Sequence, residues 1–219
     1  MCRQYSGLDR FTLMSNSHPH SAHKLGREVN LLDAELSYDG LFAAIKNKHG
    51  FLGTYEYYPQ RGKYYNDGHR DCKISVDPQM IHDGICPVCG RALTIGVARR
   101  VQQLADRTAE EARNHLKPFK YVLPLSEIFS EILGYSEDSQ KVKQVYSRAI
   151  STLGNEFDIL HNLPTKDLHR YDRKLAIAIT RLREDKKHFT AGFDNTHGRI
   201  YFFNNGELRS AKPVQTTLF

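Results

Sequence analysis

Gly68-His-Arg-Asp-Cys72 and Cys86-Pro-Val-Cys89-Gly90 are the two stretches of this 219-residue sequence that decide its fold. In each stretch, two potential metal ligands are separated by two residues, a spacing that places both side chains on one tight turn. Thirteen residues separate the two ligand pairs, so the chain has room to loop back and complete a tetrahedron. We therefore predict a zinc ion bound by His69, Cys72, Cys86 and Cys89.

The fourth ligand is the open point of this prediction. His82 lies within the intervening loop and Cys2 is the remaining cysteine, so either side chain is an alternative to His69. Another interpretation leaves three reduced cysteines without a metal. With four protein ligands the zinc has a structural role, because a catalytic zinc keeps one coordination position open.

Composition and charge narrow the class of protein. The mean hydropathy is −0.56, and no apolar stretch approaches the roughly 18–20 residues of a membrane span. Residues 1–10 also lack the apolar core of a signal peptide, so we expect a soluble, cytoplasmic protein without a membrane partner. The net charge of +6 and the pI of about 9.1 favour polyanionic partners, although a solvated basic surface explains both values equally well.

The residue pattern before the helical region predicts mixed secondary structure. We expect a helix over residues 37–48, a strand over residues 51–58 and a second helix over residues 93–105. The apolar face of the first helix consists of Leu41, Phe42 and Ile45.

The region after Pro118 is predicted to be helical. Two apolar faces at helical spacing end at Gly134 and Gly154, and a third runs from Leu168 to Leu182. Alternating residues on either side of Asp194 then indicate a hairpin.

Ser15-Asn-Ser-His18-Pro-His20 resembles the closing segment of a PHP (polymerase and histidinol phosphatase) domain of the kind that endonuclease Q-like proteins carry. Gly62-Lys-Tyr-Tyr-Asn-Asp-Gly-His69-Arg70 and Ile85-Cys-Pro-Val-Cys89-Gly90 resemble the zinc segment that follows it. Other segments with this resemblance are Gly53–Tyr57, Leu104–Arg107, Pro124–Ile128, Glu156–Leu160 and Gly192–Asp194.

The resemblance implies an α+β architecture in four parts. Residues 1–50 are expected to be the C-terminal remnant of a PHP domain, and residues 51–120 a small, β-rich zinc-binding module. Residues 121–207 are expected to form a helical, DNA-binding-like domain with a terminal hairpin, followed by a flexible tail over residues 208–219.

The resemblance also implies a role in DNA repair. Endonuclease Q-like proteins are metal-dependent endonucleases that nick DNA beside deaminated bases such as uracil and hypoxanthine, and at abasic sites. Their PHP domain holds Mg²⁺, Mn²⁺ or Zn²⁺ ions that activate water for phosphodiester hydrolysis.

This sequence departs from the PHP pattern in two ways. Most PHP metal ligands have no counterpart, and His18 stands where the family has an aspartate, whereas His20 matches a family ligand. We therefore expect a DNA-binding portion without a complete catalytic site, and the enzymatic status stays open. The alternatives are a complete endonuclease formed with a partner chain, such as a separate PHP fragment, and a non-catalytic adaptor that binds a sliding clamp.

Two sequence features indicate candidate DNA-contact residues, and the C-terminal residues indicate candidate contacts to a sliding clamp. Aromatic residues interleave with cations before residue 70, and residues 165–190 hold eight Lys/Arg against four acids. Core packing and a solvated face are the alternative explanations. The candidate DNA-contact residues are Tyr64, Tyr65, Arg70, Arg99, Arg100, Arg173, Lys174, Arg181 and Arg183. The last five residues resemble a clamp-binding peptide, with Gln215, Leu218 and Phe219 as its contact residues and a frayed terminus as the alternative.

Overall fold

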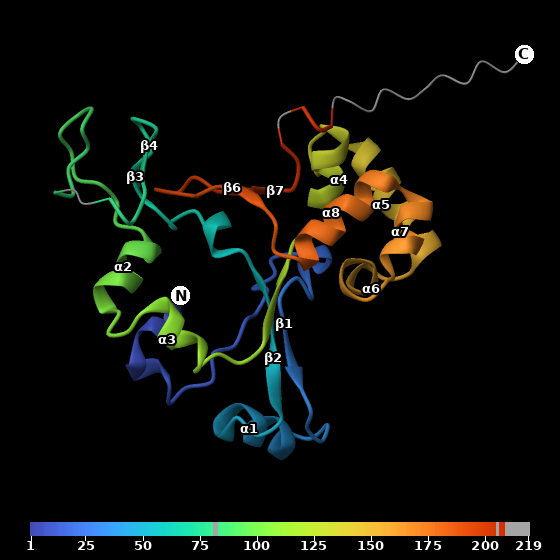
Figure 1. The fold of residues 1–219 in the computed structure, drawn as a ribbon, viewed down its shortest axis with the longest axis horizontal. Coiled ribbons are helices and arrows are strands. Elements are labelled where there is room, and N and C mark those ends of the chain that lie inside the picture. Colours follow the sequence, from blue (N-terminus) through green and yellow to red (C-terminus); the bar gives the residue numbers. More distant parts are fainter. Residues whose placement is uncertain (81–82, 205, 209–219) are drawn as a thin grey trace, which may run out of the picture. The chain divides into compact units, whose positions relative to one another are not determined.

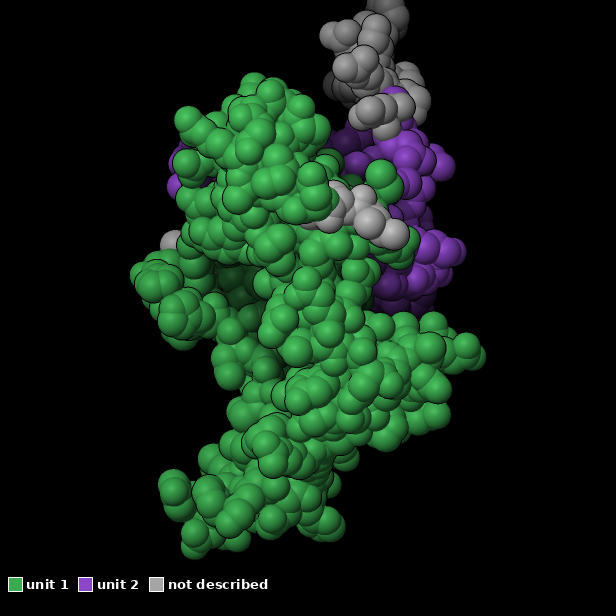
Figure 2. Space-filling view, turned by 90° about the vertical axis from the view of Figure 1, so that its left-hand side faces the viewer, with its two compact units in different colours: residues 1–122, 189–200 green, residues 123–188, 201–219 purple. Residues whose placement is uncertain are grey.

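The computed structural model describes residues 1–80, 83–204 and 206–208, which form two compact units (Figures 1 and 2). The first, called the mixed unit, comprises residues 1–122 and 189–200. The second, called the helical unit, comprises residues 123–188 and the chain from residue 201 onward. Helices and small sheets occur together, so the predicted α+β class is confirmed. The finer division into four parts stays a prediction.

A three-stranded sheet crosses the mixed unit. Its central strand β2 (Phe51–Tyr57) pairs antiparallel with β1 (Val29–Leu32) and parallel with β5 (Phe119–Val122). A Cβ atom on Gly53 would lie 2.2 Å from the carbonyl oxygen of Pro118, so the close approach of the chain leading into β5 requires glycine there. The predicted strand at residues 51–58 is therefore confirmed.

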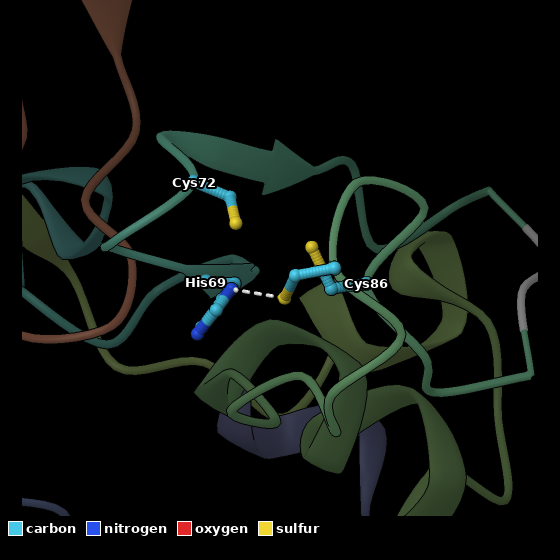
Figure 3. A group of neighbouring side chains, drawn as sticks. His69, Cys72 and Cys86 are labelled. Carbon is cyan, nitrogen blue, oxygen red and sulfur yellow. Dashed lines mark hydrogen bonds between the residues drawn. The ribbon is translucent and has the colours of Figure 1, made fainter.

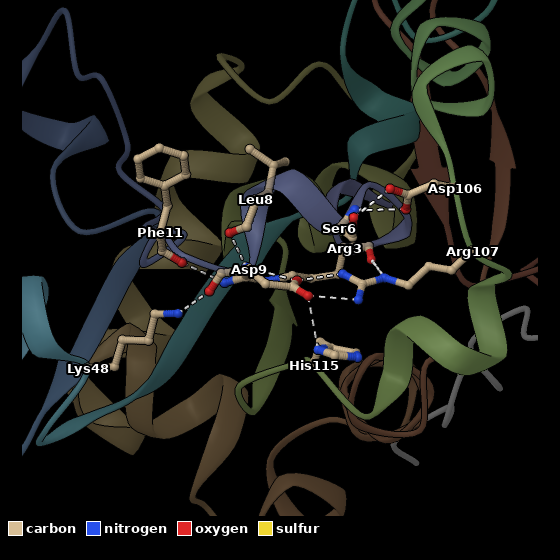
Figure 4. Close-up of polar contacts among 9 residues, drawn as sticks. All are labelled: Arg3, Ser6, Leu8, Asp9, Phe11, Lys48, Asp106, Arg107 and His115. Carbon is tan, nitrogen blue, oxygen red and sulfur yellow. Dashed lines mark hydrogen bonds and ion pairs between the residues drawn. The ribbon is translucent and has the colours of Figure 1, made fainter.

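Short 3₁₀ turns and one ion-pair network anchor the N-terminal residues within the mixed unit (Figure 4). The carboxylate of Asp9 accepts two hydrogen bonds from the guanidinium of Arg107, which lower the pKa of Asp9, and it lies 3.1 Å from Nδ1 of His115. Lys48 donates to the carbonyl oxygen of Asp9. Among the described residues, the 3₁₀ turns are Cys2–Gln4, Ser6–Leu8, Ala22–Lys24 and Pro59–Arg61.

Helix α1 (Tyr38–Asn47) confirms the prediction for residues 37–48. Ser37 caps its N-terminus by accepting from the backbone N–H of Gly40, and Lys48 ends it in a left-handed conformation. Of the predicted apolar face, Leu41 and Phe42 are exposed.

Helix α2 (Val97–Leu104) is shorter than the predicted span of residues 93–105. Its start is delayed because the backbone N–H groups of Leu93 and Thr94 bind the carbonyl oxygens of Gly84 and Gly68. Helix α3 (Ala109–Arg113) follows, and its first turn carries a capping box formed by Thr108 and Glu111.

The helical unit is built from five helices within its described residues, namely α4 (Leu125–Leu133), α5 (Gln140–Leu153), α6 (Glu156–His161), α7 (Thr165–Tyr171) and α8 (Arg173–Arg183). Gly134 and Gly154 end α4 and α5, as predicted. The third predicted apolar face is not one helix. Asp172 is extended, with φ −156° and ψ 125°, and its carboxylate accepts from the backbone N–H of Leu175 to start α8.

The predicted hairpin is present as β6 (His188–Thr190) and β7 (Arg199–Tyr201). After β7, the carboxylate of Glu131 in α4 accepts from the backbone N–H groups of Phe202 and Phe203. Both phenylalanines are buried, so this carboxylate fixes an apolar corner of the helical unit. None of the helices in the described ranges combines the length and the apolar surface that a membrane crossing requires.

Candidate metal centre

The first ligand pair lies on a turn between two short strands. His69 ends β3 (Asp67–His69), Cys72 lies in the turn, and β4 (Ile74–Val76) returns antiparallel. Lys73 adopts a left-handed φ of 55°, and its backbone N–H binds the carbonyl oxygen of Arg70 at 2.9 Å. This reversal places His69 and Cys72 on the same side of the turn.

The second ligand pair lies on a separate turn. The backbone N–H of Cys86 binds the carbonyl oxygen of Arg91 at 2.7 Å, and that of Gly90 binds the carbonyl oxygen of Cys86 at 2.9 Å. Gly90 has a φ of +71°, a conformation that glycine adopts without strain. Cys86 and Cys89 are thereby placed one turn apart.

Two backbone hydrogen bonds join the ligand-bearing turns. Gly68, next to His69, exchanges N–H···O bonds of 3.0 and 2.8 Å with Thr94, which follows the second turn. A Cβ atom on Gly68 would lie 2.5 Å from the ring of Phe193, so this contact requires glycine. The two turns therefore approach each other as parts of one backbone scaffold.

The four candidate ligand atoms converge at one point. The ring nitrogen of His69 and the three sulfur atoms all lie within 4.8 Å of one another, and Nδ1 of His69 lies 3.3 Å from Sγ of Cys89. Figure 3 shows His69, Cys72 and Cys86 pointing toward this point. Zinc bonds of about 2.0–2.3 Å give ligand separations of roughly 3.3–3.8 Å in a tetrahedron. The donor set and spacing therefore fit a metal ion after a small contraction.

The thiols have divergent acidities. Burial alone would raise the pKa of Cys86, but hydrogen bonds from the backbone N–H groups of Cys89 and Val88 and from His69 outweigh it and lower that pKa to about 6. A hydrogen bond with Cys89, together with burial and the proximity of Cys86, raises the pKa of Cys72 to about 12. The raised pKa of Cys72 opposes its deprotonation, whereas a bound cation stabilises the thiolates that ligate it.

Asp194 braces the metal centre from the β6–β7 hairpin. One carboxylate oxygen accepts from the backbone N–H of Arg70 at 2.7 Å, and the other accepts from Oγ1 of Thr94 at 2.7 Å. These hydrogen bonds lower the pKa of Asp194, which therefore stays ionised. The sequence indicates only a hairpin turn here. The resemblance of Gly192–Asp194 to endonuclease Q-like proteins marks this segment, but its contact with residues 70 and 94 is long-range and has no local sequence pattern.

The three candidates for the fourth ligand, His69, Cys2 and His82, differ in where they lie relative to the converging cysteines. His69 is in the converging group, whereas Cys2 is an exposed free cysteine outside it. His82 lies outside the described residues. The part of the chain that the structure describes holds no other group of three or more potential metal ligands.

Three comparisons place the chain among known proteins. A family model described as the MJ0043 C-terminal domain matches residues 124–186. The uncharacterized protein MJ0043 of Methanocaldococcus jannaschii is 26% identical over 200 residues, which are 88% of this chain and 25% of that protein. The uncharacterized protein YqxK of Bacillus subtilis is 28% identical over 205 residues, which are 91% of this chain and 49% of that protein.

Solved structures show the similarity in three dimensions. The crystal structure of the lesion-specific endonuclease PfuEndoQ from Pyrococcus furiosus matches with a TM-score of 0.78 and 26% identity, over 96% of this chain and 53% of that one. The predicted resemblance to endonuclease Q is confirmed. A second structure holds endonuclease Q with a 27-mer duplex substrate that has an abasic lesion at the active site. It matches with a TM-score of 0.79 and 25% identity, over 96% of this chain and 54% of that one.

The similarity to endonuclease Q is therefore partial in length. The chain spans about half of each endonuclease Q structure and half or less of the curated relatives. The candidate PHP ligands His18 and His20 are both exposed, and their ring centroids lie 4.9 Å apart. No third metal ligand joins them among the described side chains, so the pair by itself is an incomplete site.

The predicted DNA contacts in the mixed unit separate into two groups. Tyr64 is exposed, with Nζ of Lys63 5.8 Å from its ring centroid, and Arg70 and Arg100 are exposed as well. Tyr65 is half-buried, and burial raises its pKa. Arg99 is paired with the fully buried carboxylate of Asp67, so its charge is engaged within the fold.

The predicted DNA contacts in the helical unit also comprise an exposed cation and cations that are held by protein acceptors. Arg173 is exposed, and Nζ of Lys174 lies 3.4 Å from the carbonyl oxygen of Leu208. Arg181 forms a two-point ion pair with Glu207. Arg183 donates to the carbonyl oxygens of Ile159 and Leu160 in α6 and of Leu163, two residues after the end of α6. The clamp-binding residues Gln215, Leu218 and Phe219 lie outside the described residues, and that function stays a prediction.

Proposed function

We propose that this chain is the zinc-stabilised, DNA-binding portion of an endonuclease Q-like DNA repair protein. One observation carries the proposal: 96% of the chain superposes on endonuclease Q in complex with a damaged duplex. A net charge of +6 is consistent with a phosphate-binding surface.

The proposed metal is zinc, bound by His69, Cys72, Cys86 and Cys89. Three thiols and one imidazole are soft and borderline ligands that favour zinc over Mg²⁺ or Mn²⁺. Four protein ligands leave no open position, so the ion holds the two turns together and takes no part in hydrolysis. Nδ1 of His69 is the ligating nitrogen, because it faces Cys89 while Nε2 faces the carboxylate of Asp71 at 4.0 Å.

The proposed DNA contacts fall into direct and supporting roles. Tyr64 provides an exposed ring on which a base can stack, with Lys63 beside it. Arg70, Arg100, Arg173 and Lys174 provide phosphate contacts. Arg99, Arg181 and Arg183 act through the fold, because their guanidinium groups are held by protein acceptors.

The proposed lesions are deaminated bases, such as uracil and hypoxanthine, and abasic sites. A second candidate function is a complete endonuclease formed with a partner that carries the remaining PHP ligands. The observation that favours it is the incomplete pair of His18 and His20 in a chain that matches half of endonuclease Q. Incubation of the chain with uracil-containing duplex and Mn²⁺, alone and with an added PHP fragment, separates the two functions. Nicking that requires the fragment supports the second function, and no product even with the fragment contradicts it.

DNA affinity measured against salt concentration tests the main proposal. With a 27-mer duplex carrying an abasic site, we expect log K to fall linearly with log salt, by about 0.9 for each phosphate contacted. Tyr64→Ala should weaken binding by roughly 1–3 kcal/mol if a base stacks on the ring.

One further variant and one control sharpen the result. Arg100→Gln should reduce the salt slope by about 1 if the side chain contacts a phosphate. Tyr135→Ala removes a ring of similar exposure from the helical unit and should leave affinity unchanged. Binding that ignores salt, or that is absent at low salt, would contradict the proposed function.

A further inference from the structure

The loop of the β6–β7 hairpin ends in an exposed polar tip. The backbone N–H groups of Phe193 and Thr196 each bind the carbonyl oxygen of the other residue, at 3.0 and 2.7 Å, so Asp194 and Asn195 form a two-residue turn. Asn195 and Thr196 are both exposed. Nδ2 of Asn195 and Oγ1 of Thr196 make no hydrogen bond with the described residues, so both groups are available to a ligand.

The turn has a conformation that usually selects glycine. Its central residues Asp194 and Asn195 have φ values of 39° and 67°, as a type I′ turn requires, and glycine is the favoured second residue of such turns. The side chain of Asp194 has a structural role, because its carboxylate accepts from the backbone N–H of Arg70 and from Thr94. The amide of Asn195 has no comparable role, since its one contact is the hydroxyl of Tyr64, 3.4 Å from Oδ1.

Backbone contacts within the mixed unit hold the tip in place. The N–H of Asn195 binds the carbonyl oxygen of Lys63 at 2.9 Å, and the N–H of Asn66 binds the carbonyl oxygen of Gly192 at 2.9 Å. A Cβ atom on Gly192 would lie 2.2 Å from the carbonyl oxygen of Gly62, so the two segments are tightly packed. Figure 1 shows the hairpin reaching the start of β3. The tip is therefore a preorganised surface beside Tyr64.

The tip offers uncharged hydrogen-bond donors between cations. Oδ1 of Asn195 faces the hydroxyl of Tyr64, which leaves Nδ2 as a donor, and Thr196 adds a hydroxyl. The side chains of Lys63 and Arg70 are exposed, and the backbones of these two residues bind Asn195 and Asp194. In the minor groove of DNA, A·T pairs present acceptors alone, whereas G·C pairs add an amino donor. Neutral donors flanked by cations suit the A·T floor of this groove.

We propose that Asn195 and Thr196 at the hairpin tip bind base edges in the minor groove of duplex DNA. The inference rests on the proposed function and adds a base-reading contact to its phosphate contacts. Nδ2 of Asn195 donates to N3 of adenine or O2 of thymine, and the N2 amino group of guanine opposes this contact. Lys63 and Arg70 contact the flanking phosphates, and Tyr64 stacks on a base from the same groove. The chain therefore prefers A·T pairs beside the lesion.

Binding to two duplexes with a central abasic site tests the proposal. One has A·T flanks, and in the other 2,6-diaminopurine replaces every flanking adenine. This base adds an amino group to the minor groove and keeps the major-groove edge of adenine. We expect the wild-type chain to bind the adenine duplex roughly three- to tenfold more tightly. Asn195→Gly should remove this preference and leave the salt slope unchanged, because the amide carries no charge.

Two checks separate recognition from folding. Glycine adopts a φ of 67° without strain, so the melting temperature of Asn195→Gly should not fall. A fall of several degrees would show that the amide stabilises the fold and would overturn the inference. The control Asn204→Ala should keep the preference, since Asn204 is exposed and it is its backbone N–H that binds Glu207.

The outcomes for DNA are distinct. Equal affinity of the wild-type chain for both duplexes, or a preference that persists in Asn195→Gly, overturns the inference. An equal loss of affinity for both duplexes in this variant indicates a phosphate contact and overturns it too. Salt-dependent binding without a preference leaves the proposed function standing while this inference fails, whereas no binding to either duplex contradicts both.

Discussion

At the residue scale, buried and braced carboxylates decide which cations remain available to a ligand. Asp67 is fully buried between the backbone N–H of Gly96, at 2.6 Å, and the guanidinium of Arg99. Arg100, the next residue, is exposed and donates to Gln103 in its own helix. Two neighbouring arginines therefore have different roles that no charge count can separate.

Arg99→Met should destabilise the mixed unit by about 3–5 kcal/mol, because it removes the guanidinium that pairs with the buried carboxylate of Asp67. The matched substitution Arg100→Met should change stability by less than about 0.5 kcal/mol. Urea unfolding of both variants checks the prediction. Equal stability of the two variants would contradict a structural role for Arg99.

Asp194→Ala should weaken metal binding by about 10–100-fold, because the carboxylate braces both ligand-bearing turns. The measurement is competition against a chromophoric zinc chelator. His197→Ala is the control, since His197 is an exposed residue of the same hairpin. An unchanged zinc affinity in Asp194→Ala would show that the hairpin does not support the metal centre.

At the scale of elements, apolar spacing predicts where helices lie but not every break. The residues Leu168, Tyr171, Leu175, Ile179 and Leu182 fit one continuous face. The structure interrupts it at Asp172, because an aspartate side chain competes for backbone N–H groups and starts a new helix. Likewise, backbone pairing of Leu93 and Thr94 overrides their helical pattern. Such long-range pairings are absent from local periodicity.

The contact between α8 and the segment after β7 should give the helical unit an acid-sensitive component. Hydrogen bonds from Arg181 and from the backbone N–H of Asn204 lower the pKa of Glu207 from 4.5 to about 2. A lowered carboxyl pKa contributes stability above pH 4.5, and this contribution is lost as the pH falls toward 2. Urea unfolding as a function of pH should show a flatter profile for Glu207→Gln over this window. Identical profiles for the two proteins would exclude the contribution.

At the scale of the whole molecule, the group of His and Cys residues can be predicted from the sequence, whereas its surroundings cannot. The spacing along the chain suffices to bring His69, Cys72, Cys86 and Cys89 together, because each pair is local. Asp194 lies about a hundred residues further along the sequence and joins them only through tertiary structure. The exposure of α1 is also a tertiary property, since its residue pattern is that of a helix with a buried face.

Metal removal should affect the two units differently. We expect a strong chelator to speed amide exchange over residues 67–96, where the ligand-bearing turns are joined. Exchange in α5 and α8 should remain slow, because the core of the helical unit contains none of the four ligands. Exchange measured by mass spectrometry with and without chelator tests this. Equal acceleration in both units would show that the metal stabilises the chain as a single cooperative body.

The most direct test of the account is X-ray absorption spectroscopy at the zinc edge on the purified protein. We predict one zinc per chain with three sulfur ligands at about 2.3 Å and one nitrogen ligand at about 2.0–2.1 Å. Absence of zinc, or a first shell of oxygen and nitrogen atoms alone, would contradict the claim that two distant turns are held together by one metal ion.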